Sequence, residues 1–167
     1  MTNDQFVQEI YGASYRRLVG QLFAVCGDLP TAEDIVQEAF VRAVAHARTF
    51  RKTDNPEAWL RRVALNVHHS RWRRMKRHAG LTVRITPRPE TEYGSELSPD
   101  HVALVRALAE LPSAQREAVV LHHVADLPVH EIAATLGVPI GTVKARLVRG
   151  RAALAAALTE REEGHHV

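Results

Sequence analysis

Apolar residues recur along the chain at the spacing of amphipathic helices, with polar residues between them. The first such stretch, residues 6–22, predicts a helix that ends near Gly27, followed by a break at residues 28–30. A second helix is expected to begin with Thr31 as its cap and to continue to Ala47. The face opposite its apolar side carries charged and amide side chains.

Residues 49–55 are polar and are expected to form a loop. The loop ends in an Asn-Pro-Glu run at residues 55–57, which is typical of a helix start: asparagine caps well, proline fits the first helical position, and an acid suits the first turn. A third helix is therefore predicted to pass through Trp59, which we place in the core. It enters a basic stretch and fades near Arg77.

Residues 79–98 hold no sustained apolar period and are rich in glycine, proline and acids, which is typical of a linker. Helix restarts at Ser98. Later helices are expected with Ser113 as a cap, over residues 129–136, and from Ile140 to about residue 158, before a frayed tail. No strand pattern is visible, so the sequence predicts an all-α fold of two small helical domains joined by a flexible linker. The predicted limits are 1–78 for the first domain, 79–98 for the linker, 99–160 for the second domain and 161–167 for the tail.

The composition agrees with an all-α fold and indicates the cellular compartment. Apolar residues make up 46% of the 167 residues and aromatic residues only 5%, so the core must be aliphatic and alanine-rich. The single cysteine, Cys26, excludes an internal disulfide and a cysteine-based zinc site, and we expect it to be a small buried residue. The sequence has no run of 18 apolar residues and no signal-like start. We therefore expect a cytoplasmic protein without membrane insertion of its own.

The net charge of +3 conceals two strongly basic segments. Residues 61–77 carry seven Lys or Arg and residues 140–151 carry four, and neither segment contains an acid. Two such segments indicate two separate contacts with a polyanion. The alternative is that both are ordinary solvated helix faces.

Residues 129–151 have the pattern of a helix-turn-helix. A small residue, Ala133, is expected where the helices cross, and Gly137 is expected to adopt the positive φ that ends the first helix. The inward stripe of the second helix is predicted to consist of Ile140, Val143, Leu147, Gly150 and Leu154. Its outer face is basic, which suits the major groove of DNA. The alternative is a helical hairpin with no DNA-binding role.

Motifs in both halves occur together in the order typical of one family. They are residues 32–40 (AEDIVQEAF), 56–66 (PEAWLRRVALN), 108–112 (LAELP), 131–137 (EIAATLG) and 141–147 (GTVKARL). On these motifs the chain resembles bacterial RNA polymerase sigma factors of the sigma-70 family, in their small extracytoplasmic-function (ECF) subfamily. The resemblance spans about residues 6–155. It implies a sigma-2-like and a sigma-4-like helical domain.

The resemblance implies roles for residues of the first half. Asp34, Gln37 and Glu38 resemble the surface that docks on the polymerase β′ coiled coil, although a solvated helix face explains them equally well. Residues 51–57 match the loop that accepts a flipped base of the −10 element. The helix that follows matches the one that reads this element, with Trp72 expected to pack rather than to stack on a base. The implied −10 DNA-binding residues are Arg51, Lys52, Asn55, Arg62, Asn66, His69 and Arg73.

In the second half, the helix from Ile140 resembles the −35 recognition helix. The implied DNA-binding residues are Thr142, Lys144, Ala145, Arg146, Val148, Arg149 and Arg151. Three features depart from the family. Its members often have serine or threonine as the cap of the first helix of the motif, where this chain has Leu127-Pro128, and they often have serine where Ala145 stands and a bulkier residue at Val148. The acidic linker is implied to run toward the polymerase active site, or else to be a solubilising spacer.

The sequence therefore predicts an ECF-type sigma factor rather than an enzyme, with no catalytic residue, cofactor or metal. Its expected partners are core RNA polymerase, through the β′ and β subunits, promoter DNA and an anti-sigma factor. One alternative is a stand-alone helix-turn-helix regulator with an N-terminal sensing or dimerising domain. Another is a histidine metalloenzyme, because the chain holds ten histidines. The histidine spacing fits no metal motif, which argues against it.

Overall fold

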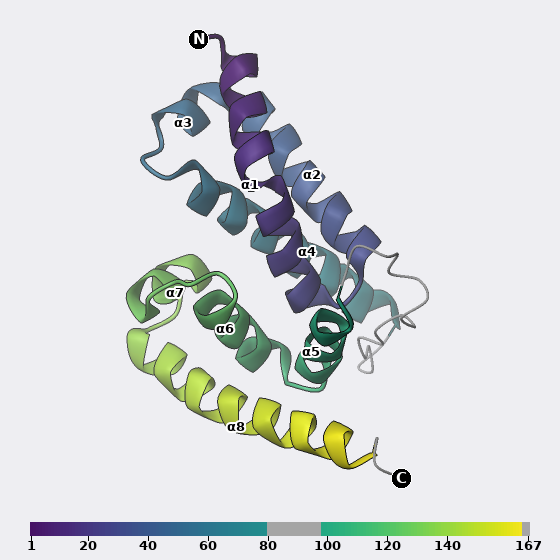
Figure 1. The fold of residues 1–167 in the computed structure, drawn as a ribbon. Coiled ribbons are helices and arrows are strands. Elements are labelled where there is room, and N and C mark those ends of the chain that lie inside the picture. The colour runs from purple at the N-terminus through teal and green to yellow at the C-terminus, as the bar shows by residue number, and fades with distance from the viewer. Residues whose placement is uncertain (80–97, 165–167) are drawn as a thin grey trace. The chain divides into compact units, whose positions relative to one another are not determined.

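The computed structural model describes residues 1–79 and 98–164, and its regular secondary structure there is entirely helical (Figure 1). The all-α prediction is confirmed. The helices are α1 (Asn3–Cys26), α2 (Leu29–Ala45), α3 (Ala47–Lys52), α4 (Pro56–Ala79), α5 (Pro99–Ala109), α6 (Ser113–His123), α7 (Val129–Leu136) and α8 (Ile140–Gly164). Helices α1 to α4 belong to one compact unit and α5 to α8 to another. Almost all of the predicted linker, residues 79–98, lies outside the described residues.

The first helix, α1, ends where the sequence predicts. Gly27 follows it with φ 76°, a left-handed conformation that glycine adopts without strain, and its N–H bonds the Phe23 carbonyl. At the other end, Thr2 and Gln5 form a reciprocal capping box. Cys26, the last residue of α1, is buried as expected.

The start of α2 differs from the prediction. The N-cap is Asp28 rather than Thr31, and its Oδ2 accepts hydrogen bonds from both the backbone N–H and the hydroxyl of Thr31. Pro30, which we expected to break the chain, lies inside the first turn of the helix. A proline is tolerated there because the N–H groups of the first turn have no intrahelical partner to lose.

A short helix, α3, occupies much of the segment that was predicted to be a loop. Its buried residue is Phe50, whose ring lies 5.6 Å from that of Phe6 and 5.0 Å from that of Trp59, between centroids. The other side chains of α3 are polar or small, so the apolar signal in the sequence amounts to a single residue. Burial of Phe50 therefore holds a helix that local periodicity could not predict.

The remaining core of the first unit forms where α1, α2 and α4 pack together (Figure 1). Helix α4 begins as predicted, with Asn55 Oδ1 accepting a hydrogen bond from the Ala58 N–H at 3.0 Å. Leu60 of α4, Ile35 of α2 and Phe23 of α1 are fully buried. The aliphatic core expected from the composition is present.

The second unit begins with α5, which Ser98 caps as predicted. Helix α6 follows after Pro112, which occupies the N-cap position that we assigned to Ser113. The buried Arg116 of α6 donates from Nε to the Leu108 carbonyl and from Nη2 to the Leu111 carbonyl, both at 2.9 Å. A guanidinium therefore binds one carbonyl in the last turn of α5 and one in the segment that follows it.

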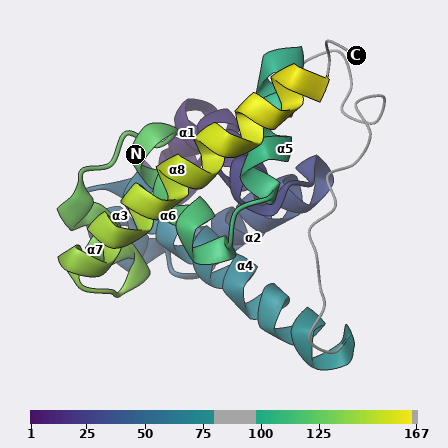
Figure 2. The ribbon, with the colours of Figure 1, turned by 90° about the horizontal axis from the view of Figure 1, so that it is seen from below.

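Helices α7, α6 and α5 follow one another along α8, as both ribbon views show (Figures 1 and 2). Gly137 has φ 67° and ends α7, and Ala133 is buried, as the helix-turn-helix pattern requires. Helix α8 reaches Gly164, so the segment expected to fray from residue 160 is largely helical. Arg161 Nη2 lies 2.6 Å from Glu110 Oε1 beyond the end of α5 and fixes this last part of α8.

Candidate nucleic-acid interfaces

The three predicted docking residues lie on one side of α2. Asp34 and Gln37 are exposed, and Glu38 is half-buried. Gln37 Nε2 lies 3.4 Å from the Tyr15 hydroxyl of α1. The structure thus brings together an anionic and amide surface, as the spacing predicts.

Glu38 is also bonded to two arginines. Its Oε1 accepts from Arg42 Nη2, one turn along α2, and its Oε2 accepts from Arg71 Nη2 on α4, both at 2.9 Å. The hydrogen bond from Arg71 is the main cause that lowers the pKa of the Glu38 carboxyl, with Arg42 adding to it. The carboxylate is therefore ionised at neutral pH and joins the docking surface to the basic helix.

The basic segment of α4 is not wholly a surface feature, which corrects the sequence-based picture. Arg61 is only 5% exposed, and its Nε donates to Gln21 Oε1 at 2.9 Å. Its Nη2 lies 3.7 Å from Glu57 Oε2. Arg71 is bonded to Glu38. Arg61 and Arg71, two of the seven basic side chains, are therefore bonded to other side chains of the protein.

Four predicted −10 residues form a stripe on α4. Arg62, Asn66 and Arg73 are exposed and His69 is half-buried. Within the described ranges no carboxylate pairs with Arg62 or Arg73. Trp72 is half-buried, and Lys76 Nζ lies 5.7 Å from the centroid of its ring. This part of α4 therefore offers cations and one amide to a ligand.

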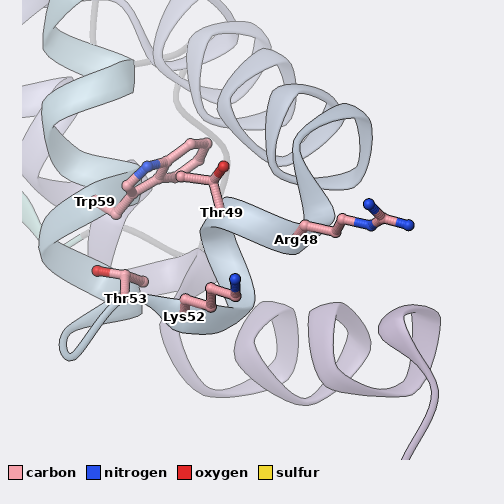
Figure 3. A pocket seen from close by; sticks show the side chains of 5 residues that line it. All are labelled: Arg48, Thr49, Lys52, Thr53 and Trp59. Atoms are coloured by element: carbon pink, nitrogen blue, oxygen red, sulfur yellow. The ribbon is translucent and has the colours of Figure 1, made fainter.

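A surface hollow of about 390 Å³ lies between α3 and the start of α4. Its lining consists of Arg48, Thr49, Lys52, Thr53 and Trp59. Figure 3 shows the Trp59 indole beside Thr49, whereas the Arg48 side chain points away from the indole. Trp59 is half-buried rather than wholly in the core, which corrects our expectation.

Of the three −10 residues predicted in this segment, Arg51, Lys52 and Asn55, only Lys52 lines this hollow. Arg51 donates from Nη1 to Asn3 Oδ1 at 3.1 Å and from Nη2 to the Met1 carbonyl at 2.8 Å. Asn55 caps α4. The predicted −10 residues did not include Arg48, Thr49 and Thr53. No local signal placed these side chains together, because burial of Phe50 against the distant Phe6 holds the helix that positions them.

Most of the residues predicted to contact the −35 element are exposed on α8. Lys144, Ala145, Val148, Arg149 and Arg151 are exposed, and Thr142 and Arg146 are half-buried. Val143, Leu147 and Gly150 are buried, as predicted for the inward stripe. Leu154 is half-buried, and Ile140, expected to point inward, is 47% exposed because it is the first residue of the helix.

Arg151 has a partner on α6. Its Nε donates to His123 Nε2 at 3.0 Å, so that nitrogen carries no proton. Partial burial is the main cause that lowers the pKa of the His123 imidazole, and the positive charge of Arg151 is the second. The neutral imidazole thus orients one of the predicted DNA-binding arginines.

The histidines do not assemble into a recognisable metal centre in the part of the chain that the structure describes. No group of three His, Cys, Asp or Glu side chains there could hold an ion. His122 Nδ1 lies 2.9 Å from the Leu127 carbonyl, a contact that helps to close the turn after α6. Likewise, no helix among the described residues is long and apolar enough to span a membrane.

Comparison with known proteins identifies the family. Residues 10–78 match sigma-70 region 2, and residues 101–154 match sigma-70 region 4. The ECF RNA polymerase sigma factor SigW of Bacillus subtilis is 30% identical, over 90% of this chain and 83% of its own length. The chain belongs to the ECF family of sigma-70 sigma factors. It is an RNA polymerase sigma factor, as its motifs indicate, and not a stand-alone regulator.

Other relatives of this ECF sigma factor agree. The RNA polymerase sigma-E factor of Streptomyces coelicolor is 33% identical over 78% of this chain and 73% of its own. The sigma factor RpoE of Bartonella quintana, solved in complex with the anti-sigma factor NepR, is 28% identical. It superposes with a TM-score of 0.77 over 93% of this chain and 97% of that one.

Proposed function

We propose that this sigma factor binds core RNA polymerase, directs it to promoters with −35 and −10 elements, and helps to open the DNA. It acts through binding and catalyses no reaction, so it needs no cofactor or metal. Residues 1–78 form the sigma-2-like domain and residues 99–160 the sigma-4-like domain, joined by the linker at 79–98. The match to sigma-70 regions 2 and 4 is the main support for this proposal. Exposed cations lie on α4 and on α8, one helix in each unit, and agree with it.

Docking on the polymerase is assigned to the exposed face of α2. Asp34 and Gln37 offer a carboxylate and an amide to a basic partner, and Glu38 contributes an ionised carboxylate that two arginines already hold in place. Electrostatic complementarity of this kind raises the rate at which two partners associate and fixes how they align. The partner is the β′ coiled coil, which the family resemblance implies.

Contact with the −10 element is assigned to α4 and the neighbouring hollow. Arg62 and Arg73 would contact phosphates, and Asn66 a base edge, because arginine and asparagine suit those groups. The hollow has the size and lining to receive one unstacked base, with an indole ring and hydroxyls at its wall and Lys52 at its edge. Holding an extruded base and the exposed phosphates offsets the free energy lost on unstacking, so the DNA can open without ATP.

Contact with the −35 element is assigned to α8, the second helix of the helix-turn-helix. Its exposed residues Lys144, Arg149 and Arg151 supply positive charge over about two turns. A helix with such a face enters the major groove and holds the flanking phosphates. Thr142, Ala145, Arg146 and Val148 complete the surface that faces the groove.

Run-off transcription with core polymerase and fragmented genomic DNA tests this function. We expect initiation from a small set of fragments, and only when both the chain and core polymerase are present. Core polymerase alone and the chain alone are the controls. Initiation that does not depend on the chain, or that starts equally on all fragments, would contradict the proposal.

An anti-sigma factor is proposed as a further partner, since RpoE, a relative of the same fold, was solved with one. We expect it to cover the Asp34–Glu38 face of α2 or the Lys144–Arg151 part of α8, because covering either face blocks a required contact. Hydrogen exchange of the purified complex tests this expectation. Both segments exchanging as freely as in the free chain would count against it.

A further inference from the structure

The outermost strip of α8 is apolar, although the helix is basic. Successive residues of a helix turn by 100°, so the buried Val143, Leu147 and Gly150 define the inward direction. The opposite direction is that of Ala145, with Gly141 and Val148 beside it. Ala145 and Val148 are exposed, and Val148 is 66% exposed.

Cations flank this apolar strip on both sides. Lys144 and Arg151, seven positions apart, lie along one edge, and Arg146 and Arg149, three apart, lie along the other. Within the described ranges no carboxylate pairs with any of the four. His123 of α6 accepts a hydrogen bond from Arg151 Nε, which orients that guanidinium.

The arrangement matches the cross-section of a major groove. Cations at both edges suit the two phosphate backbones, and the strip between them faces the edges of the bases. Methyl groups cannot donate or accept a hydrogen bond, so this strip cannot bond to guanine or adenine. The apolar group that base pairs present in the major groove is the C5 methyl of thymine.

We propose that Ala145 and Val148 determine −35 specificity by contacting thymine methyl groups. The inference rests on the proposed function, in which α8 enters the major groove. The four flanking cations without acidic partners favour DNA over a protein as the occupant of this face. The variants described below distinguish a thymine contact from the alternative, in which a protein partner covers Val148.

The test uses the chain bound to core polymerase and a pool of duplexes randomised over the −35 region. The selected motif is then synthesised with thymine or with uracil, which differs from thymine only by the missing methyl. At one or more T·A pairs of the motif we expect uracil to weaken binding by about fourfold, the factor for burying one methyl group. Equal affinity for thymine and uracil at every position, or a motif without T·A pairs, would overturn the proposal.

Variants of Val148 assign the effect to a residue. Val148→Ser removes both methyl groups of the valine and leaves only a hydroxyl, so the penalty for uracil at one position should shrink toward onefold. The matched control is Val44→Ser on α2, which makes the same change at an exposed valine of the first unit and should leave the penalty unchanged. A uracil penalty that is the same in Val148→Ser, in Ala145→Gly and in the unaltered chain would also overturn the assignment.

Failure of this inference is distinguishable from failure of the proposed function. If run-off transcription shows promoter-specific initiation and a −35 motif is selected, the proposed function is supported whether or not uracil weakens binding. If no motif is selected and initiation does not depend on the chain, the function itself fails. Binding that Val148→Ser weakens equally on thymine and uracil duplexes would point to a protein contact and overturn the proposal.

Discussion

Gly150 of α8 lies directly against Val119 of α6: a Cβ atom added to Gly150 would sit 2.6 Å from Val119 Cγ2 and 3.3 Å from the Gln115 carbonyl oxygen. Two helices approach so closely only where one of them lacks a side chain. We expect Gly150→Ala to lower the free energy of unfolding of the second unit by about 1–3 kcal/mol, because overpacking forces a shift of the backbone. Chemical denaturation followed by circular dichroism measures it.

The matched control is Gly141→Ala on the same helix, where a Cβ meets nothing within 4 Å. That variant should be as stable as the unaltered chain or slightly more stable, because alanine favours helix over glycine. If Gly150→Ala were as stable as Gly141→Ala, the helices would not approach each other as closely at Gly150 and Val119 as the structure indicates.

The bond between Glu38 and Arg71 makes a pH-dependent contribution to stability. Arg71 lowers the pKa of the Glu38 carboxyl below its usual value of 4.5, so the stabilisation is complete above that pH and is lost as the pH falls through the lowered pKa. Both side chains are more than a third exposed, so the contribution is small, below about 1 kcal/mol. The free energies of unfolding of the unaltered chain and Glu38→Gln should differ at neutral pH and converge as the pH falls through the lowered pKa. A difference that grows on acidification would contradict this.

The bond between Arg151 and His123 can be followed by titration. Both partial burial and the charge of Arg151 lower the pKa of His123, so the neutral imidazole stabilises the fold above the unfolded pKa and the stabilisation is lost as the pH falls below it. Arg151→Ala removes the second cause, and the pKa of His123 should rise without passing far beyond its usual range. NMR titration of the imidazole measures it, with Arg149→Ala as the control that leaves the pKa unchanged. A pKa that stays the same or falls in Arg151→Ala would show that the contact is absent.

Two substitutions should separate polymerase binding from promoter recognition. Asp34→Ala removes an exposed carboxylate from the docking face and should weaken binding to core polymerase by several-fold, the effect expected for one charge of an interface. Arg149→Ala should leave core binding unchanged and weaken initiation that depends on the −35 element. The two readouts are core affinity by fluorescence anisotropy and run-off yield with core polymerase saturated by the chain and the holoenzyme limiting over promoter. Identical profiles for the two variants would be inconsistent with separate sites.

Local chemistry was enough to predict part of this molecule. Asn55 and Ser98 act as caps in the structure, and Gly137 ends α7, because these features depend on residues within one turn. The helix-turn-helix followed from periodicity, since its inward side chains lie at regular spacing. Thr31 was misassigned because a proline in a first turn and a proline that breaks a helix look alike in sequence.

Long-range contacts account for the other differences. Phe50 holds α3 through Phe6, which is far away in the chain, so a segment with one apolar residue looked like a loop. Arg61 and Arg71 counted as surface charges until the structure placed Gln21 and Glu38 beside them, from positions 40 and 33 residues away. Periodicity places a residue on a face of its helix but does not say what covers that face.

We propose that this chain opens promoters only as part of a holoenzyme. Permanganate reactivity of thymines in the −10 region of a promoter found by run-off transcription tests it most directly, because permanganate attacks unstacked thymines. We expect reactive thymines when the chain and core polymerase are both present, and none with either alone. Tight, specific promoter binding by the chain alone, with no reactive thymines after core polymerase is added, would contradict the account.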